Sequence, residues 1–325
     1  MVFLCCDAGS TKTEFLLASD KQGLLATKRF PACNYLELGE TGFSENMQVW
    51  IKEICCTGGI TPDQLTFSVF GLPALGEVEG LEQGAAKALG RFVSSENMLL
   101  CNDAVLGWAG SLEGKAGIHV VSGTGSIVYG ENEQGISKRV GGWSLLFDDP
   151  GSSAWVGRQA LSLFFRQVDG REPRSSLYTV FCEHWGLGEH PEYFVGKALP
   201  TLNISRTELA RVQLLARKAA EAGDQAVKCI YDQAVDLLAE QVRVVRDSLH
   251  FHSACQVSYS GGFFQNGDRV LQPFKAKLDA LNMILVPPTY SPILGALALG
   301  ARRFLAPEAL TMFLKRTQEV MKFSA

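Results

Sequence analysis

Several features that identify common kinds of protein are missing from this chain of 325 residues. It has no run of about 18 apolar residues, the length that crosses a bilayer, and its N-terminus lacks the basic and apolar regions of a signal peptide. Its nine cysteines form no Cys-x-x-Cys pair, and its five histidines form no cluster of ligands. A zinc or iron–sulfur site of the usual spacing is therefore not predicted. We expect free thiols in a reducing compartment, the cytoplasm.

A strong excess of one charge is also lacking, because 30 Lys and Arg residues stand against 34 Asp and Glu residues, for a net charge of −4. The densest basic stretch, residues 211–218 with Arg243 and Arg246, has helical spacing and is mixed with acids. That pattern is typical of a solvated helix face. We therefore expect neither a nucleic acid nor a membrane as a partner.

The short signatures of several large enzyme classes are absent as well. The chain contains no G-x-x-x-x-G-K-[ST], no G-x-G-x-x-G after a strand and no D-F-G, which argues against P-loop, dinucleotide-binding and protein-kinase folds. It also lacks H-E-x-x-H and G-x-S-x-G, the signatures of zinc peptidases and of many serine hydrolases.

The composition is that of a globular protein, with 46% hydrophobic residues, 20% charged residues and 33 glycines. The length favours two domains. Short apolar strands alternate with helical patterns: strands are predicted at residues 2–6, 15–19, 24–30, 66–70, 98–101, 118–121, 127–129, 256–260 and 283–286. Helices are predicted at about 42–56, 77–92, 205–222, 224–250, 266–281, 293–304 and from 307. The sequence therefore predicts an α/β protein with two related halves.

Two similar turns follow the first strand of each half. Asp7-Ala8-Gly9-Ser10-Thr11-Lys12-Thr13 comes after residues 2–6, and Ser122-Gly123-Thr124-Gly125-Ser126 comes about 115 residues later, after residues 118–121. We interpret the recurrence as a weak internal duplication. Such turns expose backbone N–H groups and hydroxyls, so that a polyphosphate can approach closely. The alternative is an ordinary pair of hairpins whose glycines only supply positive φ.

Other side chains near these turns fit a nucleotide. Asp7, at the end of its strand, can orient a hydrated Mg²⁺ ion, and Lys12 can neutralise phosphate charge. A third small-residue turn, Ser260-Gly261-Gly262, also follows a strand and has Asn266 nearby. Its backbone could pack flat against adenine. Each of these three elements is weak evidence alone, and together they predict an ATP site.

These motifs resemble those of the N-acetylglucosamine kinase and BadF/BadG/BcrA/BcrD-type ATPase family, which has the fold of actin, hexokinase and Hsp70. The resemblance runs in order through nearly the whole chain: the two turns above, Asn102-Asp103-Ala104, Gly141-Gly142-Trp143, Asp149-Pro150-Gly151-Ser152, Trp155, Ser260-Gly261-Gly262 and Pro292-Ile293-Leu294-Gly295-Ala296. It implies two actin-like (ribonuclease H-like) domains with a nucleotide cleft between them. We place the first at residues 1–115, which the helix of about 307–325 could also cover, and the larger second at 116–306.

The resemblance also implies roles for individual residues. Asp103 corresponds to the catalytic base, although the same residue could instead be a helix N-cap. The expected ATP and phosphate contacts are Asp7, Gly9, Ser10, Thr11, Lys12, Thr13, Gly123, Thr124, Gly125, Ser126, Ala210, Gly261, Gly262 and Asn266. The expected sugar contacts are Asn34, Asn102, Asp103, Gly142, Trp143 and Asp149. Trp143 could equally be a core aromatic residue, and Asp149 could belong to a turn before a helix.

The expected activity is an ATP- and Mg²⁺-dependent kinase that phosphorylates a hydroxyl of an amino sugar, N-acetylglucosamine first. Glucosamine or N-acetylmuramic acid is the alternative acceptor. Two competing hypotheses are a BadF-type ATPase and a regulator that binds sugar or nucleotide without turnover. The chain departs from the family pattern at Pro150, where Glu is usual, at Asp148, where Gly is usual, and in the segment Pro31-Ala32-Cys33, where a glycine is expected. A homodimer is implied by the resemblance alone.

Overall fold

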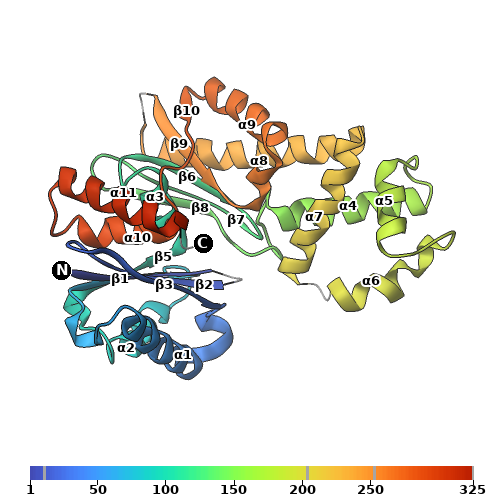
Figure 1. The fold of residues 1–325 in the computed structure, drawn as a ribbon. Coiled ribbons are helices and arrows are strands. Elements are labelled where there is room, and N and C mark those ends of the chain that lie inside the picture. Colours follow the sequence, from blue (N-terminus) through green and yellow to red (C-terminus); the bar gives the residue numbers. More distant parts are fainter. Residues whose placement is uncertain (10–11, 203–204, 252–253, 324–325) are drawn as a thin grey trace. The chain divides into compact units, whose positions relative to one another are not determined.

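The computed structural model describes residues 1–9, 12–202, 205–251 and 254–323, and the chain forms two compact units (Figure 1). Unit 1 comprises Met1–Lys115 and Pro287–Ala325, and unit 2 comprises Ala116–Val286. The chain thus returns to unit 1 at Pro287, whereas the sequence analysis ended the second domain at residue 306. The reason is α10 (Pro292–Ala301), which packs on a helix and two strands of unit 1.

Unit 1 contains a five-stranded sheet in the order β3-β2-β1-β4-β5. Its strands are β1 (Val2–Ala8), β2 (Lys12–Ser19), β3 (Gly23–Pro31), β4 (Phe67–Leu72) and β5 (Met98–Asn102), and its helices are α1 (Tyr35–Thr57), α2 (Leu81–Leu89), α3 (Asp103–Ser111), α10 and α11 (Pro307–Phe323), with short 3₁₀ turns at Pro62–Gln64 and Ser95–Asn97. β1, β2 and β3 are antiparallel neighbours, and β1, β4 and β5 run parallel.

Helices cover both faces of this sheet, which explains why the first five residues of β1, Val2 to Cys6, are all apolar rather than alternating. Leu4, Cys6 and Ala8 face the core formed with α1 and α2. Phe3, which directly precedes Leu4 in the sequence and so lies on the opposite face of the strand, contacts Phe304 and Phe313. The ring-centroid distances are 5.9 and 6.0 Å. Because side chains alternate between the two faces of a strand, β1 contributes to a separate core on each side.

Unit 2 contains a second five-stranded sheet, in the order β10-β9-β6-β7-β8. Its strands are β6 (Gly117–Ser122), β7 (Ser126–Glu131), β8 (Ser137–Gly141), β9 (Cys255–Ser260) and β10 (Met283–Leu285). Its helices are α4 (Ser153–Val168), α5 (Ser176–His184), α6 (Phe194–Leu202), α7 (Arg206–Glu221), α8 (Gln225–Ser248) and α9 (Asp268–Ala280), with 3₁₀ turns η3 (Pro191–Tyr193) and η4 (Gly262–Asn266).

The two sheets have the same topology. In each, three strands that are consecutive in the chain form an antiparallel meander, and two later strands join its first strand in parallel. The predicted α/β class with two related halves is thereby confirmed, and the two turns noted in the sequence occupy the same place in both sheets, between the first and second strands.

The structure differs from the sequence-based elements in several places. α1 begins at Tyr35 and not at about residue 42, and α3, α4, α5 and α6 were not among the helices predicted by their ranges. The strand β8 was not predicted, since Ser137-Lys138-Arg139 is too polar to indicate a buried strand. The helix predicted at 77–92 is limited to Leu81–Leu89, because Gly80, with φ of 79°, precedes it and Gly90 ends it. None of the helices that the structure describes combines the length and the hydropathy needed to cross a membrane.

Candidate active site

The first candidate turn joins β1 to β2 in unit 1. The hairpin pairs Asp7 with Glu14 and Ala8 with Thr13, and the Gly9 amide donates to the Lys12 carbonyl at 2.8 Å. Ser10 and Thr11, which we predicted as phosphate contacts, lie outside the described residues. The Lys12 ammonium pairs with Glu14 at 3.1 Å and is half exposed, so this cation is held at the mouth of the hairpin.

Asp7 has an unusual electrostatic environment. Burial, and then the negative charges of Asp103 and Glu14, raise its pKa to about 7, and Lys12 opposes the shift only in part. Two carboxylates that destabilise each other in this way favour a cation near them. The interaction also shows that Asp7 and Asp103 lie close together, although 96 positions separate them in the sequence.

Strand pairing explains how Asp103 comes to lie near Asp7. In the parallel part of the sheet, Asp7 aligns with Gly71 on β4, and Gly71 aligns with Cys101 on β5. Asp103 follows β5 directly and is the first residue of α3. Since the carboxyl ends of parallel strands meet at one edge of a sheet, both carboxylates reach that edge, where ligands of open α/β sheets commonly bind.

The N-cap of α3 is Asn102 and not Asp103, which corrects one of the two interpretations of Asp103 that the sequence allowed. The Asn102 side-chain oxygen accepts from the Ala104 amide at 3.0 Å. Asp103 also accepts from this amide at 3.0 Å through Oδ1. Because Asn102 provides the cap, this helix start does not depend on Asp103, whose charge lies at the positive end of the helix dipole.

A glycine on β4 allows α3 to approach the sheet. A Cβ atom at Gly71 would lie 2.2 Å from Leu106 Cδ1, 2.7 Å from Leu106 Cγ and 3.4 Å from the Asp103 Cα atom. Any larger residue at position 71 would therefore push the first turn of α3, and Asp103 with it, away from β4.

Glu77 is a site residue that the sequence analysis missed. Its carboxylate accepts from Asn102 Nδ2 at 3.0 Å, and the same amide donates to the Leu75 carbonyl at 3.2 Å. These bonds fix the Asn102 side chain in the orientation that caps α3. Asn102, predicted as a sugar contact, is thus held by protein atoms. No local motif marks Glu77, because it lies in the loop after β4 and meets Asn102 only through the fold.

Asn34 occupies a comparable position at the start of α1. Its Oδ1 accepts from the Leu36 amide at 3.0 Å, and its Nδ2 donates to Glu37 at 3.2 Å. Asn34 is therefore the N-cap of this helix. Cys33, the departure from the family pattern beside it, is buried.

The second candidate turn, in unit 2, is held from behind by the segment 149–153. Ser122 Oγ donates to the Gly151 carbonyl at 2.8 Å, and Ser126 Oγ donates to the Pro150 carbonyl at 2.7 Å. The Ser153 amide donates to the Gly123 carbonyl at 2.8 Å. Pro150 has no backbone N–H group, but its carbonyl accepts the hydrogen bond from Ser126, so the change from Glu to Pro leaves this support in place. The Ser126 hydroxyl, predicted to contact phosphate, already donates its hydrogen to the Pro150 carbonyl.

Asp149 is buried and forms an ion pair with Arg206, the first residue of α7, at 2.8 Å. Burial raises the pKa of Asp149, and Arg206 opposes the rise. The pair lies against Gly125, where a Cβ atom would be 2.3 Å from Arg206 NH2 and 2.8 Å from Asp149 Oδ2. Arg206, which no motif indicated, therefore brings a half-exposed positive charge to the second turn.

The third predicted element packs directly on the second turn. Gly261 has φ of 103°, and a Cβ atom there would lie 2.2 Å from the Ser122 carbonyl oxygen and 2.8 Å from the Gly123 nitrogen. Only glycine fits this contact. The structure thus brings the Ser122–Ser126 turn and Gly261-Gly262 together, as the ATP-site prediction requires of unit 2.

A polar network supports this element from α7. Gln213 Nε2 donates to Asn266 Oδ1 at 3.0 Å, and Arg217 donates to the Gln265 carbonyl at 3.4 Å. Ala210 lies three residues before Gln213 and seven before Arg217, on the same face of the helix. Asn266 in turn donates to the Phe263 carbonyl at 2.6 Å. Ala210 is therefore on the face of α7 whose side chains bond to the end of η4, where Asn266 lies.

The predicted sugar contacts in unit 2 are less uniform. The Gly142 amide donates to the Ser126 carbonyl at 2.9 Å, which ties β8 to the second turn. Trp143 is 56% exposed, so it is not a core residue, and the Arg139 guanidinium lies 4.4 Å from its ring centroid. Leu146 and Phe147, in the loop that follows, are exposed as well.

The chain matches the BadF/BadG/BcrA/BcrD ATPase family over residues 4–300, which is most of its length. It belongs to this family. The BadF/BadG/BcrA/BcrD match includes every motif discussed above, from Asp7 to the glycine pair at Gly261.

Two curated relatives of this BadF/BadG/BcrA/BcrD ATPase family member have named activities. The N-acetyl-D-glucosamine kinase of Dictyostelium discoideum is 26% identical over 319 residues, which cover 93% of this chain and 99% of the relative. The N-acetylmuramic acid/N-acetylglucosamine kinase of Clostridium acetobutylicum is 28% identical over 183 residues, 56% of this chain and 59% of the relative.

A solved structure from Chromobacterium violaceum, which carries the provisional name N-acetylglucosamine kinase, matches with a TM-score of 0.71 at 23% identity. The match covers 92% of this chain and 98% of the other. At that identity the likeness shows that the two chains share a fold and nothing about activity.

No group of three or more metal-binding side chains occurs within residues 1–9, 12–202, 205–251 and 254–323. The Asp7–Asp103 pair, with its raised pKa at Asp7, is compatible with a different arrangement, in which a cation is bound through water and substrate oxygens.

Proposed function

We propose that this protein is an ATP-dependent kinase that phosphorylates a hydroxyl of an amino sugar, N-acetylglucosamine first. The observation that carries the proposal is the match to a kinase named for this sugar over 99% of the relative's length. The site geometry is consistent with it, because the first residue after β5 is a carboxylate beside Asp7, and the two small-residue elements of unit 2 pack on each other.

The residues have different tasks in the proposed reaction. Asp103 would accept the proton of the acceptor hydroxyl as its oxygen attacks the γ-phosphorus of ATP and ADP leaves. The Gly123 amide already donates to the Gly125 carbonyl at 2.9 Å. The other backbone N–H groups at the tip of the Ser122–Ser126 turn would be offered to phosphate oxygens, with the charge of Arg206 beside them. Gly261-Gly262 would give adenosine a flat backbone surface, supported by Asn266.

Mg²⁺ fits the first unit because Lys12 offsets only part of the rise in the pKa of Asp7. Asp7 would hold the ion through water, and Mg²⁺ would offset charge on the phosphates of ATP. Asn34, Gly142, Trp143 and Asp149 are proposed to bind the sugar. Asp149 would act there together with its partner Arg206, as a neutral pair and not as a free carboxylate.

The first experiment measures ADP release with Mg²⁺ and ATP against N-acetylglucosamine, N-acetylmuramic acid, glucosamine and glucose. Wild type is expected to turn over an amino sugar, and N-acetylmuramic acid tests the second curated relative's other substrate. Absence of acceptor-dependent turnover with every sugar, in a protein that binds ATP, would contradict the kinase proposal and favour an ATPase or regulator.

The base assignment is tested by Asp103→Asn, which keeps size and helix position. We expect kcat to fall by roughly 10²–10⁴-fold with little change in the KM for ATP. The matched control is Asp268→Asn, since Asp268 is also the first residue of a helix, α9, and is exposed. Its kcat should equal that of wild type. A kcat of Asp103→Asn within about threefold of wild type would remove the base assignment.

We also propose a cytoplasmic location and a homodimer. Nine free thiols, several of them buried, suit a reducing compartment. Light scattering of the purified protein would give the mass of the assembly.

A further inference from the structure

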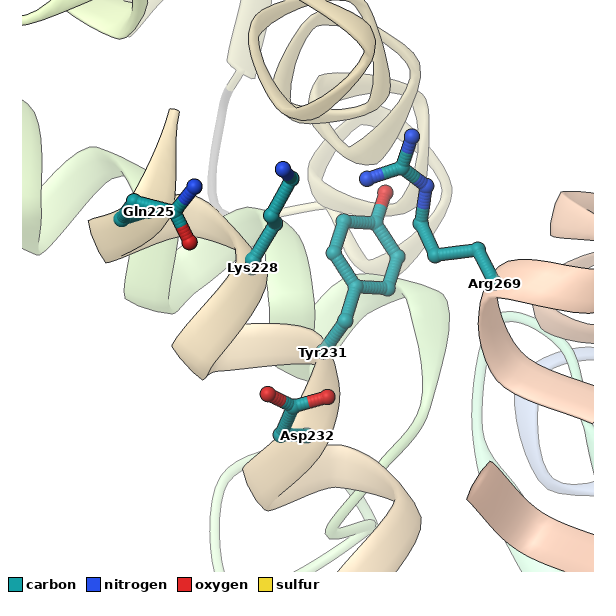
Figure 2. Close-up of a pocket in the computed structure, with 5 residues that line it drawn as sticks. All are labelled: Gln225, Lys228, Tyr231, Asp232 and Arg269. Atoms are coloured by element: carbon teal, nitrogen blue, oxygen red, sulfur yellow. The ribbon is translucent and has the colours of Figure 1, made fainter. Parts of the chain in front are cut away.

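A polar pocket in unit 2 is lined by none of the residues assigned above (Figure 2). Its volume is about 480 Å³, and it is lined by Gln225, Lys228, Tyr231 and Asp232 of α8 and Arg269 of α9. This volume is in the range of small-molecule sites, ~300–1,000 Å³. Every lining side chain is polar or carries a polar group, so the pocket would suit a hydrophilic ligand.

Neither of the two cations in the pocket is held in a close ion pair, although the charge of Arg269 helps to lower the pKa of Glu221. Among the residues that the structure describes, neither Lys228 nor Arg269 forms an ion pair, whereas Lys275 and Lys277 on α9 pair with Asp279 and Asp236. Both Lys228 and Arg269 are half-buried. Partly desolvated cations that are not held in a close ion pair attract an anion, and a guanidinium matches the geometry of a phosphoryl group.

The pocket has two chemically different ends. Figure 2 shows the ammonium of Lys228, the guanidinium of Arg269 and the hydroxyl of Tyr231 on one side, and the carboxylate of Asp232 at the opposite side. The amide of Gln225 lies beyond Lys228. A ligand that places a phosphoryl group between the cations could donate hydroxyl hydrogens to Asp232.

Hydrogen bonds connect this pocket to the proposed adenosine surface. Tyr231 Oη accepts from Gln213 Nε2 at 2.6 Å and donates to the Gln213 carbonyl at 3.3 Å. The same Nε2 donates to Asn266 Oδ1, and Asn266 donates to the Phe263 carbonyl next to Gly262. Burial raises the pKa of Tyr231 to about 12, so its hydroxyl stays protonated and keeps both bonds.

We propose that this pocket binds a phosphate ester of a polyhydroxylated small molecule and that its occupancy changes ATP affinity through Tyr231, Gln213 and Asn266. Lys228 and Arg269 hold the phosphoryl group, Gln225 donates to it, and Asp232 accepts from hydroxyls. The phosphorylated product of the proposed reaction belongs to this class of ligand. The coupling to ATP rests on the proposed function, whereas the binding itself does not.

Isothermal titration without nucleotide tests the binding, using glucose 6-phosphate, N-acetylglucosamine 6-phosphate, inorganic phosphate and glucose. The two esters should bind, and inorganic phosphate should bind more weakly because it cannot reach Asp232. The double variant Lys228→Met, Arg269→Met keeps the alkyl stems and should lose at least about tenfold in ester affinity. The control Lys275→Met, Lys277→Met removes two paired, exposed cations from α9, the helix of Arg269, and should bind the esters as wild type does.

Equal ester affinity of wild type and the Lys228, Arg269 double variant would overturn the site, as would the absence of ester binding to wild type at about 10 mM. A preference between the two esters distinguishes the product from other sugar phosphates. Since the titration requires no turnover, its result stands even if no sugar is phosphorylated.

The coupling is tested by measuring the Kd for ATP with and without saturating ester. A change of about fivefold or more is expected in wild type, with the reciprocal change in ester affinity. Tyr231→Phe removes the hydroxyl but leaves both cations, so it should bind ester within about threefold of wild type and lose the effect on ATP. An unchanged ATP response in Tyr231→Phe would rule out the proposed route.

Discussion

Gly261→Ala should disrupt the contact between the two small-residue elements of unit 2. The new Cβ atom would lie 2.2 Å from the Ser122 carbonyl oxygen and 2.4 Å from its carbon. Both are backbone atoms, and Ser122 is anchored by its own bond to the Gly151 carbonyl. The clash can therefore be relieved only by separating β9 from β6 at this end of the sheet.

The magnitude has two parts. A residue other than glycine at φ of 103° costs about 1–3 kcal/mol, and forcing an extra methyl group into a packed contact costs about 1–3 kcal/mol more. Gly267→Ala separates the two, because Gly267 also has positive φ, 64°, but no atom lies within 4 Å of its Cβ position. It should lose only the backbone part.

Urea unfolding of wild type and both variants, followed by intrinsic fluorescence, measures the free energy of unfolding. Gly261→Ala should be less stable than Gly267→Ala by about 1–3 kcal/mol, and its affinity for ATP should fall much further than that of the control. Equal stability of the two variants would show that the close packing of Gly261 on Ser122 does not contribute to stability. It would contradict the inference that the Ser122–Ser126 turn and Gly261-Gly262 form one surface.

Three further predictions concern other close contacts and one buried titratable group. Gly71→Ala should destabilise the protein by about 1–3 kcal/mol and lower kcat, because the new methyl group displaces α3 and the carboxylate of Asp103; unchanged kcat in steady-state assays would contradict this. Gly125→Ala should displace the guanidinium that neutralises the buried Asp149 and reduce stability by a few kcal/mol, measured by urea unfolding; a stability equal to wild type would show that the pair can move aside. Burial lowers the pKa of His119 to about 3, below the value of ~6.5 in an unfolded chain, so the unfolded state binds more protons between these pH values. The free energy of unfolding should therefore fall by up to about 1.4 kcal/mol per pH unit as pH drops from ~6.5 towards 3. In His119→Gln this part of the pH dependence should disappear, and an unchanged dependence of stability on pH would refute the prediction.

Local chemistry explains why much of the architecture could be predicted from the sequence. The apolar run at the start of β1, the small-residue turn after it, and the recurrence of that turn at Ser122 are all signals carried by neighbouring residues. They predicted the two halves and the places of the turns. β8 was not predicted because its residues are polar and partly exposed. α2 is shorter than predicted because Gly80 precedes its first turn, and hydrophobic periodicity does not show such a boundary.

The partners of the site residues were decided by tertiary structure, because they are distant in the sequence. Asp103 was recognisable as the residue after a strand, yet only strand order brings it near Asp7 and raises the pKa of that carboxyl. Glu77 reaches Asn102 from a loop, and Arg206 reaches Asp149 across 57 positions. Ion pairs and hydrogen bonds of this kind depend on distances of a few ångströms between side chains, and those distances are set when the sheet and its helices pack together.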